Sequence, residues 1–243
     1  LALVKAKILT QLPDAHIIDI SHNIANFDIA EAAFILKMVL DEFPKDTIHI
    51  VGVGSQDVDK IEHLGVRYKN QYILTANNGF LSLIAEQHPD TLVELTMNIE
   101  SDVLTFPVRD LYAPAAAYLA NGGTLEVIGR KVENTVSRMM IHPTTGSDYI
   151  HGRIVYVDKY GNAISNIHQS LFKKIRQDRG FLIGFVHKGY EIDHLSQRYG
   201  DVPKSERLAL FNSGGYLEIA INEGHASDLL GLDKSETIII TFG

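Results

Sequence analysis

Cysteine is absent from this sequence of 243 residues. Its absence excludes disulfide bonds, catalysis by a thiolate and zinc sites built from cysteine ligands. A chain without cysteine fits a reducing compartment, and we expect a cytoplasmic protein. Long apolar runs are also missing. No stretch approaches the roughly 18 apolar residues of a membrane-spanning helix, and no signal peptide is visible, so we expect no membrane partner.

Positively charged residues are fewer than negatively charged ones. The chain has 22 lysines and arginines against 30 aspartates and glutamates, a net charge of −8. This balance argues against a nucleic-acid partner, which would call for a basic patch. It remains compatible with a small ligand that carries its own positive charge. The chain opens at Leu1 rather than at a methionine, so we expect the natural N-terminus to lie upstream.

Strand and helix patterns alternate from the first residues to about residue 143. Capping residues Asp28 and Glu31 mark one helix start. The spacing of apolar residues predicts helices at 1–9, 29–43 and 109–121 and strands at 16–20, 47–53, 71–75 and 91–95. Alternation of this kind is typical of a sheet covered by helices. We therefore expect residues 1–143 to form an α/β domain with a mostly parallel sheet.

The pattern then changes to short strands separated by Gly and Asn turns. Only residues 169–176 and 224–230 have a helical pattern in this region. The predicted strands are 150–157, 180–187, 207–211, 216–221 and 236–242. At roughly 150 residues per domain, the chain has room for a second, smaller domain. We expect residues 144–243 to form a C-terminal β-barrel.

Two segments carry residue types that bind metals or phosphates. His16, Asp19 and His22 could ligate a metal, but on a strand His16 and Asp19 point to opposite faces, so a structural polar cluster is favoured and no metal site is predicted. The glycines of residues 52–55 follow a strand, yet no lysine follows them and the dinucleotide-binding pattern is incomplete. A flexible loop at the carboxyl end of a strand, where ligands bind in open α/β sheets, is favoured there.

Three turns share a small polar side chain beside glycine at the end of a strand. They cover residues 77–79, 158–162 and 212–215. Turn chemistry alone explains such residues. Amide, hydroxyl and backbone N–H groups with one carboxylate are also what recognition of a polar, charged small molecule requires. No Ser-His-Asp arrangement is evident, and the residues alone do not name the ligand.

At these turns the sequence resembles a known family, the S-adenosylmethionine (SAM) hydroxide adenosyltransferases, which are related to the SAM-dependent fluorinase and chlorinase. Six segments resemble family motifs, in order and along almost the whole chain. They are Asp19-Ile-Ser-His22 (D-I-T-H), Phe43-Pro-Lys-Asp-Thr-Ile-His-Ile50 (F-P-x-G-T-V-H-V), Asn77-Asn-Gly-Phe-Leu81 (D-N-G-L-L), Arg109-Asp-Leu-Tyr-Ala-Pro114 (R-D-I-F-A-P), Asp158-Lys-Tyr-Gly-Asn-Ala-Ile-Ser-Asn-Ile167 (D-x-F-G-N-x-x-T-N-I) and Asn212-Ser-Gly-Gly-Tyr-Leu-Glu-Ile-Ala220 (N-S-x-G-Y-L-E-I-A).

The resemblance implies a homotrimer, with SAM between the N-terminal domain of one subunit and the C-terminal domain of the next. It implies that a nucleophile attacks the ribose C5′ and that methionine leaves, with no cofactor beyond SAM itself. The substrate-binding residues implied by position are Phe27, Asn78, Asp158, Tyr160, Asn162, Ser213 and Gly214. A carboxylate suits the ammonium and sulfonium groups, and aromatic faces suit adenine and a cation.

The chain also departs from the family pattern. The family's opening T-D-F-G strand is absent from this sequence. The Asp-Arg-His set with which the hydrolases activate water falls, by position, on Gly54, Ile61 and Pro107, none of which can take a proton. The catalytic residues are therefore unknown. Asp57 and Asp59 on the same loop are the first substitutes to consider.

The resemblance predicts cleavage of SAM to adenosine and L-methionine by transfer to water, at a reduced rate. Loss of general acid–base groups typically costs about 10²–10⁴-fold. A SAM- or adenosine-binding protein without turnover and an enzyme that transfers the adenosyl group to a halide are the alternatives. The family's halogenases keep a Tyr and a small residue beside the halide, and Gly54 and Val108 do not reproduce that site.

Overall fold

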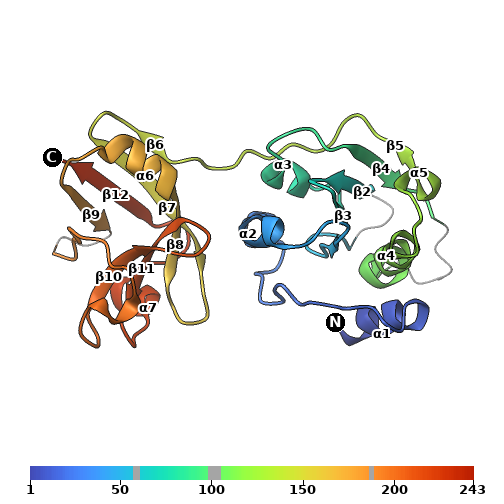
Figure 1. The fold of residues 1–243 in the computed structure, drawn as a ribbon, viewed down its shortest axis with the longest axis horizontal. Coiled ribbons are helices and arrows are strands. Elements are labelled where there is room, and N and C mark those ends of the chain that lie inside the picture. The colour runs from blue at the N-terminus through green and yellow to red at the C-terminus, as the bar shows by residue number, and fades with distance from the viewer. Residues whose placement is uncertain (57–60, 98–104, 186–188) are drawn as a thin grey trace. The chain divides into compact units, whose positions relative to one another are not determined.

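The computed structural model describes residues 1–56, 61–97, 105–185 and 189–243 (Figure 1). Contacts divide the chain into two compact units, Leu1–Met140 and Ile141–Gly243. The sequence pattern placed the boundary after residue 143. Within the described ranges, no helix is both long enough and apolar enough to cross a lipid bilayer.

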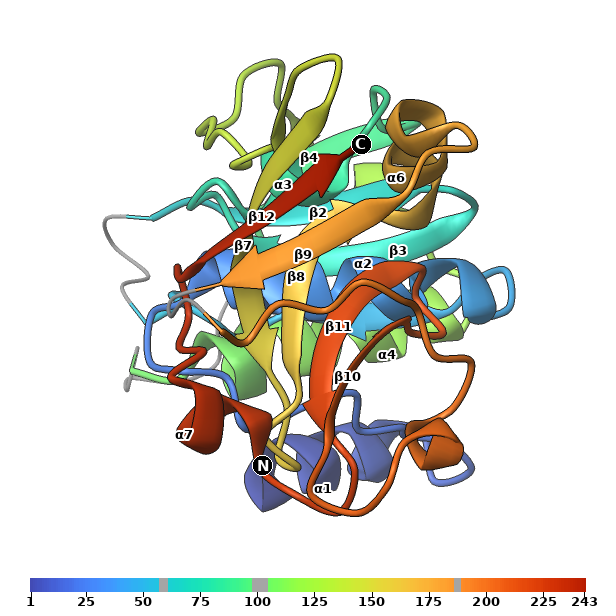
Figure 2. The same ribbon diagram turned by 90° about the vertical axis from the view of Figure 1, so that its left-hand side faces the viewer.

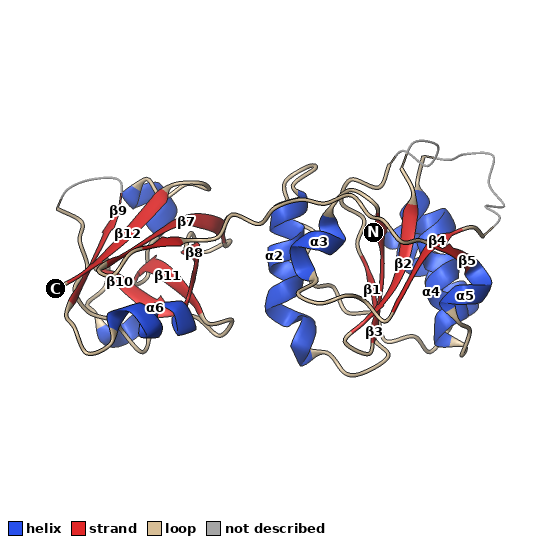
Figure 3. Ribbon diagram, turned by 90° about the horizontal axis from the view of Figure 1, so that it is seen from above, coloured by secondary structure: helices blue, strands red, loops and turns tan. Residues whose placement is uncertain are grey.

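Unit 1 is a five-stranded sheet between two layers of helices (Figure 3). One face packs on α2 and α3, and the other packs on α4 and α5. The helices are α1 (Ala2–Gln11), α2 (Ile29–Val39), α3 (Phe80–Ile84), α4 (Ala113–Ala120) and α5 (Leu125–Ile128), with a 3₁₀ turn at Leu40–Glu42 and a π turn at Val108–Tyr112. The strands are β1 (Ile48–Ile50), β2 (His63–Tyr68), β3 (Gln71–Ala76), β4 (Thr91–Leu95) and β5 (Gly129–Lys131), in the order β1-β3-β2-β4-β5.

The sheet of unit 1 is mixed, so the expected mostly parallel sheet is wrong. Only β1 and β3 run parallel; β2 is antiparallel to β3 and β4, and β4 to β5. The cause is β2, a strand that the sequence pattern did not predict. A two-residue turn joins β2 to β3, and both turn residues have positive φ, 50° at Lys69 and 60° at Asn70. Turns of this kind match the twist of antiparallel hairpins, so they reverse the chain directly into the neighbouring strand.

The N-terminal part of unit 1 confirms one expectation and corrects another. Asp28 caps α2 by accepting a hydrogen bond from the Glu31 backbone N–H at 2.8 Å. Residues 16–20, expected as a strand, form no strand, because none of the described strands pairs with them. Ile18 is accordingly 68% exposed. Without a strand geometry, Asp19 and His22 come together at 3.0 Å, and Lys5 joins them at 2.6 Å from Asp19.

Unit 2 is built on an antiparallel sheet in the order β10-β11-β8-β7-β12-β9, with β6 paired to β7 (Figure 2). Its strands are β6 (Thr144–Thr145), β7 (Tyr149–Val157), β8 (Ala163–His168), β9 (Phe181–Phe185), β10 (Arg207–Phe211), β11 (Tyr216–Ile221) and β12 (Thr237–Phe242); its helices are α6 (Gln169–Arg176), a 3₁₀ turn at Tyr199–Asp201 and α7 (Ala226–Leu230). The sheet curls around one core. The antiparallel, β-rich character is confirmed, but the form is a half-barrel, since the described pairings end at β10 and β9.

The two faces of β10 and β11 have different surroundings. Leu217, Ile219 and Ile221 point into the main core of unit 2. On the opposite face, Ala220 joins Leu208 and Leu210 in a small separate apolar cluster. Residues on this second face alternate with the core residues along each strand. The second face also carries a charged residue, Glu218, which lies directly opposite Leu210.

Candidate functional site

Three loops of unit 1 meet at one edge of its sheet. Because β1 and β3 are parallel, the segments that follow them, 51–55 and 77–79, leave the sheet at the same edge. The start of the antiparallel β2 lies there too, since the Asn77 N–H donates to the Glu62 carbonyl at 2.7 Å. The π turn approaches the same edge, because a Cβ on Gly52 would lie 2.9 Å from Val108 Cγ2. The carboxyl edge of parallel strands is a common ligand position.

Asn78 fastens this edge together. Its Nδ2 donates to the carbonyls of Val53 (2.9 Å) and Gly54 (3.3 Å), and its Oδ1 accepts from the Phe80 N–H at 3.1 Å. Gly79 follows with φ +94°, a conformation that favours glycine, and begins α3. The turn expected at residues 77–79 is present, and α3 follows it directly. All three of these contacts are internal, so Asn78 serves at least to hold the loops in place.

The positions of the missing water-activating set hold no acid or base. Gly54 has φ +67°, and a Cβ there would lie 2.9 Å from Asn78 Nδ2. Ile61 is half-buried beside β2. Pro107 is buried and precedes the π turn with φ −56°. Asp57 and Asp59, the substitutes considered above, lie outside the described residues.

Phe27 has an unusual backbone conformation. Its φ is +65°, and 69% of the residue is exposed. Bulky residues rarely adopt positive φ, and such strain is found preferentially at functional sites. Ile29, two residues later, has its Cδ1 3.6 Å from the place of a Cβ on Gly54. Phe27 therefore lies two residues before Ile29, which is close to the loop that carries Gly54.

Two buried histidines of unit 1 are residues that the sequence patterns did not single out as site residues. His63 Nδ1 lies 2.6 Å from the Tyr112 hydroxyl, and its buried Nε2 has no partner among the described residues. Burial lowers the pKa of His63 and raises that of Tyr112. Burial likewise lowers the pKa of His49, which contacts Gln71. Burial therefore favours the neutral form of both histidines. Their contacts join segments that lie far apart in the sequence.

In unit 2, Asp158, Tyr160 and Asn162 lie in one tight turn between β7 and β8. Asp158 Oδ1 accepts from the backbone N–H groups of Tyr160 and Asn162, both at 2.9 Å, and Oδ2 accepts from Asn162 Nδ2 at 3.0 Å. Gly161 has φ +80°, and a Cβ there would collide with the ring of His225. Tyr160, at the tip of this turn region, is 66% exposed.

Ser213 and Gly214 lie in the turn between β10 and β11. Asn212 holds this turn: its Oδ1 accepts from the N–H groups of Gly214 and Tyr216, both at 3.1 Å. The Gly215 N–H donates to the Asn212 carbonyl at 2.9 Å. Within the described part of the chain, neither the N–H nor the hydroxyl of Ser213 has a protein partner. Two free donors on an ordered turn suit a carboxylate ligand.

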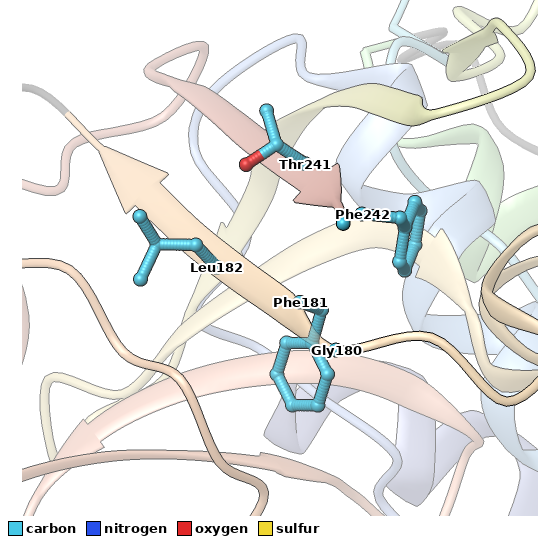
Figure 4. A pocket seen from close by; sticks show the side chains of 6 residues that line it. Gly180, Phe181, Leu182, Thr241 and Phe242 are labelled. Carbon is cyan, nitrogen blue, oxygen red and sulfur yellow. The ribbon is translucent and has the colours of Figure 1, made fainter.

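Two pockets of the structure lie away from these turns. Figure 4 shows one of about 350 Å³ between the ends of β9 and β12, lined by Gly180, Phe181, Leu182, Thr241, Phe242 and Gly243. Thr241 is the only polar side chain among these lining residues, and none of them carries a charged side chain. A second, of about 670 Å³, lies along β4 and β5 between residues 88 and 133. Neither contains a predicted site residue.

Both units match domains of one known protein family. Residues 1–129 match the SAM hydroxide adenosyltransferase N-terminal domain, and residues 152–239 match the C-terminal domain of the same family. The chain belongs to the SAM hydroxide adenosyltransferase family. The match covers every predicted site residue, including the three positions at which the water-activating set is replaced.

Curated relatives of this adenosyltransferase-family chain include proteins named for SAM hydrolysis and proteins named fluorinase. It is 28% identical to "(R)-S-adenosyl-L-methionine hydrolase" of Thermus thermophilus, over 96% of this chain and 91% of the relative. It is 26% identical to the protein of that name from Methanocaldococcus jannaschii, over 94% and 84%. A protein named "Fluorinase" from Nocardia brasiliensis is also 26% identical, over 91% and 85%.

Solved structures share the family fold. An uncharacterized conserved protein from Thermotoga maritima superimposes with a TM-score of 0.89 at 30% identity, covering 99% of this chain and 94% of that one. A conserved hypothetical protein from Thermus thermophilus superimposes with a TM-score of 0.74 at 25% identity, covering 100% and 93%. The two-unit architecture is thus that of known relatives along nearly the whole chain.

Proposed function

We propose that this protein hydrolyses SAM to adenosine and L-methionine. The observation that carries the proposal is the match of both units to the adenosyltransferase family, together with relatives named for SAM hydrolysis. In the reaction, a water oxygen attacks the ribose C5′ while the bond from C5′ to sulfur breaks. The bonding electrons go to sulfur, which becomes the neutral thioether of methionine, and a proton leaves to solvent. SAM is the substrate, and no further cofactor or metal is needed.

Binding of SAM uses the two turns of unit 2 and the loop edge of unit 1. Asp158 holds the α-ammonium group, because a carboxylate forms charge-assisted hydrogen bonds with it. The free N–H and hydroxyl of Ser213 bind the methionine carboxylate, and Gly214 lies beside them in the same turn. Asn162 supports Asp158, and Asn78 supports the loop edge. Phe27 and Tyr160 present exposed aromatic faces to adenine and the sulfonium.

Catalysis without the Asp-Arg-His set depends on positioning. The sulfonium makes methionine a good leaving group, so holding a water molecule in line with the breaking bond supplies part of the acceleration. Gly54, Ile61 and Pro107 add no proton transfer, and we expect a correspondingly slow enzyme.

The direct test is to incubate the pure protein with SAM, with and without chloride, and to follow the products by chromatography. We expect adenosine and L-methionine in equal amounts, unaffected by chloride. Formation of 5′-chloro-5′-deoxyadenosine in chloride would instead establish halide transfer. SAM bound stoichiometrically without any product would establish a binding protein and overturn the hydrolase proposal.

We further propose that the protein is a homotrimer with SAM between the N-terminal domain of one subunit and the C-terminal domain of the next. The proposal is supported by the division of the proposed binding residues between two compact units. Sedimentation equilibrium at micromolar concentration should give about three times the mass of one 27.0 kDa chain. A monomer at that concentration would contradict it.

A further inference from the structure

A buried carboxylate lies on the second face of the sheet in unit 2, beneath the turn that carries Ser213. Glu218 on β11 is only 3% exposed. Its neighbours on that face are apolar, namely Leu208, Leu210 and Ala220. A carboxylate in such surroundings is costly unless its oxygens are hydrogen-bonded. Both of its oxygens are indeed bonded, each to a different side chain.

The two partners of Glu218 come from different loops. The Tyr199 hydroxyl, in the 3₁₀ turn at Tyr199–Asp201, donates to Oε1 at 2.7 Å. Asn212 Nδ2 donates to Oε2 at 3.3 Å. The same Asn212 holds the next turn through its Oδ1, which accepts from the N–H groups of Gly214 and Tyr216. Tyr199, Glu218 and Asn212 thus form a continuous chain of hydrogen bonds that ends at the Ser213 turn.

Both donors in this chain are neutral, and no cation among the described residues is bonded to Glu218. Burial raises the pKa of Glu218, the bonds from Tyr199 and Asn212 oppose this rise, and the charge of nearby Asp158 adds to it. Burial, with the bond to Glu218, raises the pKa of Tyr199 as well, so the phenol keeps its proton and donates it. The charge of Asp158 raises the pKa of both Tyr199 and Glu218.

We propose that Tyr199 and Glu218 act as positioning residues, which fix Asn212 so that the free donors of Ser213 face the ligand carboxylate. This inference rests on the proposed function and extends it to two residues outside the turns already assigned. The Asn212 side chain is held at its oxygen by two backbone N–H groups, and Glu218 supplies the acceptor that holds its amide nitrogen. Glu218 in turn has a fixed rotamer because Tyr199 occupies its other oxygen. A loosened Asn212 leaves the turn, and the Ser213 donors with it, free to vary in position.

The test is Tyr199→Phe, which removes one hydroxyl and keeps the ring. Tyr199 is 44% exposed, so the fold should tolerate the change. We expect the Kd for SAM to rise about three- to tenfold, in line with the loss of one hydrogen bond. The Kd for adenosine, which lacks the amino-acid end, should stay within about twofold. In turnover the KM for SAM should rise and kcat should stay near its starting value.

Two further variants sharpen this test. Tyr190→Phe is the matched control, because Tyr190 lies in the same unit and is 38% exposed, and it should leave both Kd values unchanged. Glu218→Gln, whose amide presents one acceptor instead of two, should raise the Kd for SAM at least as much as Tyr199→Phe. Equal SAM affinity in Tyr199→Phe and the parent, or equal weakening for SAM and adenosine, would overturn the positioning role. Failure of the parent protein to bind SAM would instead overturn the proposed function.

Discussion

Replacement of Asp158 with asparagine should weaken SAM binding about ten- to hundredfold. The change keeps the shape of the side chain and removes its charge. A hydrogen bond to a charged group contributes about 1.5–3 kcal/mol, and each 1.4 kcal/mol corresponds to about a factor of ten in affinity. Titration calorimetry with SAM measures the change directly. Adenosine, which has no ammonium or sulfonium group, should bind with nearly unchanged affinity.

The local geometry makes this substitution a clean one. In Asp158→Asn the new side chain retains an Oδ1 that accepts from the N–H groups of residues 160 and 162, as the aspartate does. Its amide nitrogen faces Asn162, whose own amide can turn to present an oxygen in place of the present Nδ2 donor. The turn therefore keeps its hydrogen bonds while its charge is lost. Asp193→Asn, at an exposed carboxylate of the same unit, is the control for the change in net charge. Unchanged SAM affinity in Asp158→Asn would mean that Asp158 serves only its own turn.

Secondary structure was predictable where local sequence and packing agree. The bounds of α6, β10 and β11 match the predicted ranges, because each has its own apolar period and its own turn residues. Strand β2 was missed, since His63, Gly65 and Arg67 give little strand signal. It is a strand because β3 and β4 on either side pair with it. Residues 16–20 show the converse: β-branched side chains form no strand without a neighbour to pair with.

The candidate site likewise contains residues that the sequence could predict and residues that it could not. The turns that hold Asn78, Asp158 and Ser213 were predictable, because glycine and small polar residues mark them in the sequence. Tyr199 was not, since it lies outside every motif and reaches Glu218 only through the fold. The pairing of His63 with Tyr112, 49 residues apart, is equally invisible in the sequence. Long-range packing brings together the residues that hold the site in place, and local sequence patterns do not encode such packing.

The largest gain in activity should come from restoring the lost water-activating set as a whole. Gly54→Asp, Ile61→Arg and Pro107→His, made singly, should each leave the rate of SAM hydrolysis near its starting level, because one member has no partner with which to hold water. Residues that act as a unit are strongly non-additive. The triple variant should exceed the product of the single effects, with a gain of up to about 10²–10⁴-fold, the range that acid–base groups supply.

The backbone at Gly54 and Pro107 decides whether the triple variant can fold. Gly54 has φ +67°, which aspartate tolerates better than most residues but still at a cost, and its Cβ would press on Asn78 Nδ2 at 2.9 Å. Pro107 is buried, so a histidine there brings an N–H that needs a partner.

The triple variant must first show native circular dichroism and SAM affinity. A second triple variant with Pro107→Gln keeps these backbone changes without a proton-accepting ring, and it should remain slow. If the folded, SAM-binding histidine variant only matches the product of the single effects, the three positions are not those of the lost set. The search for the catalytic base then moves to Asp57 and Asp59.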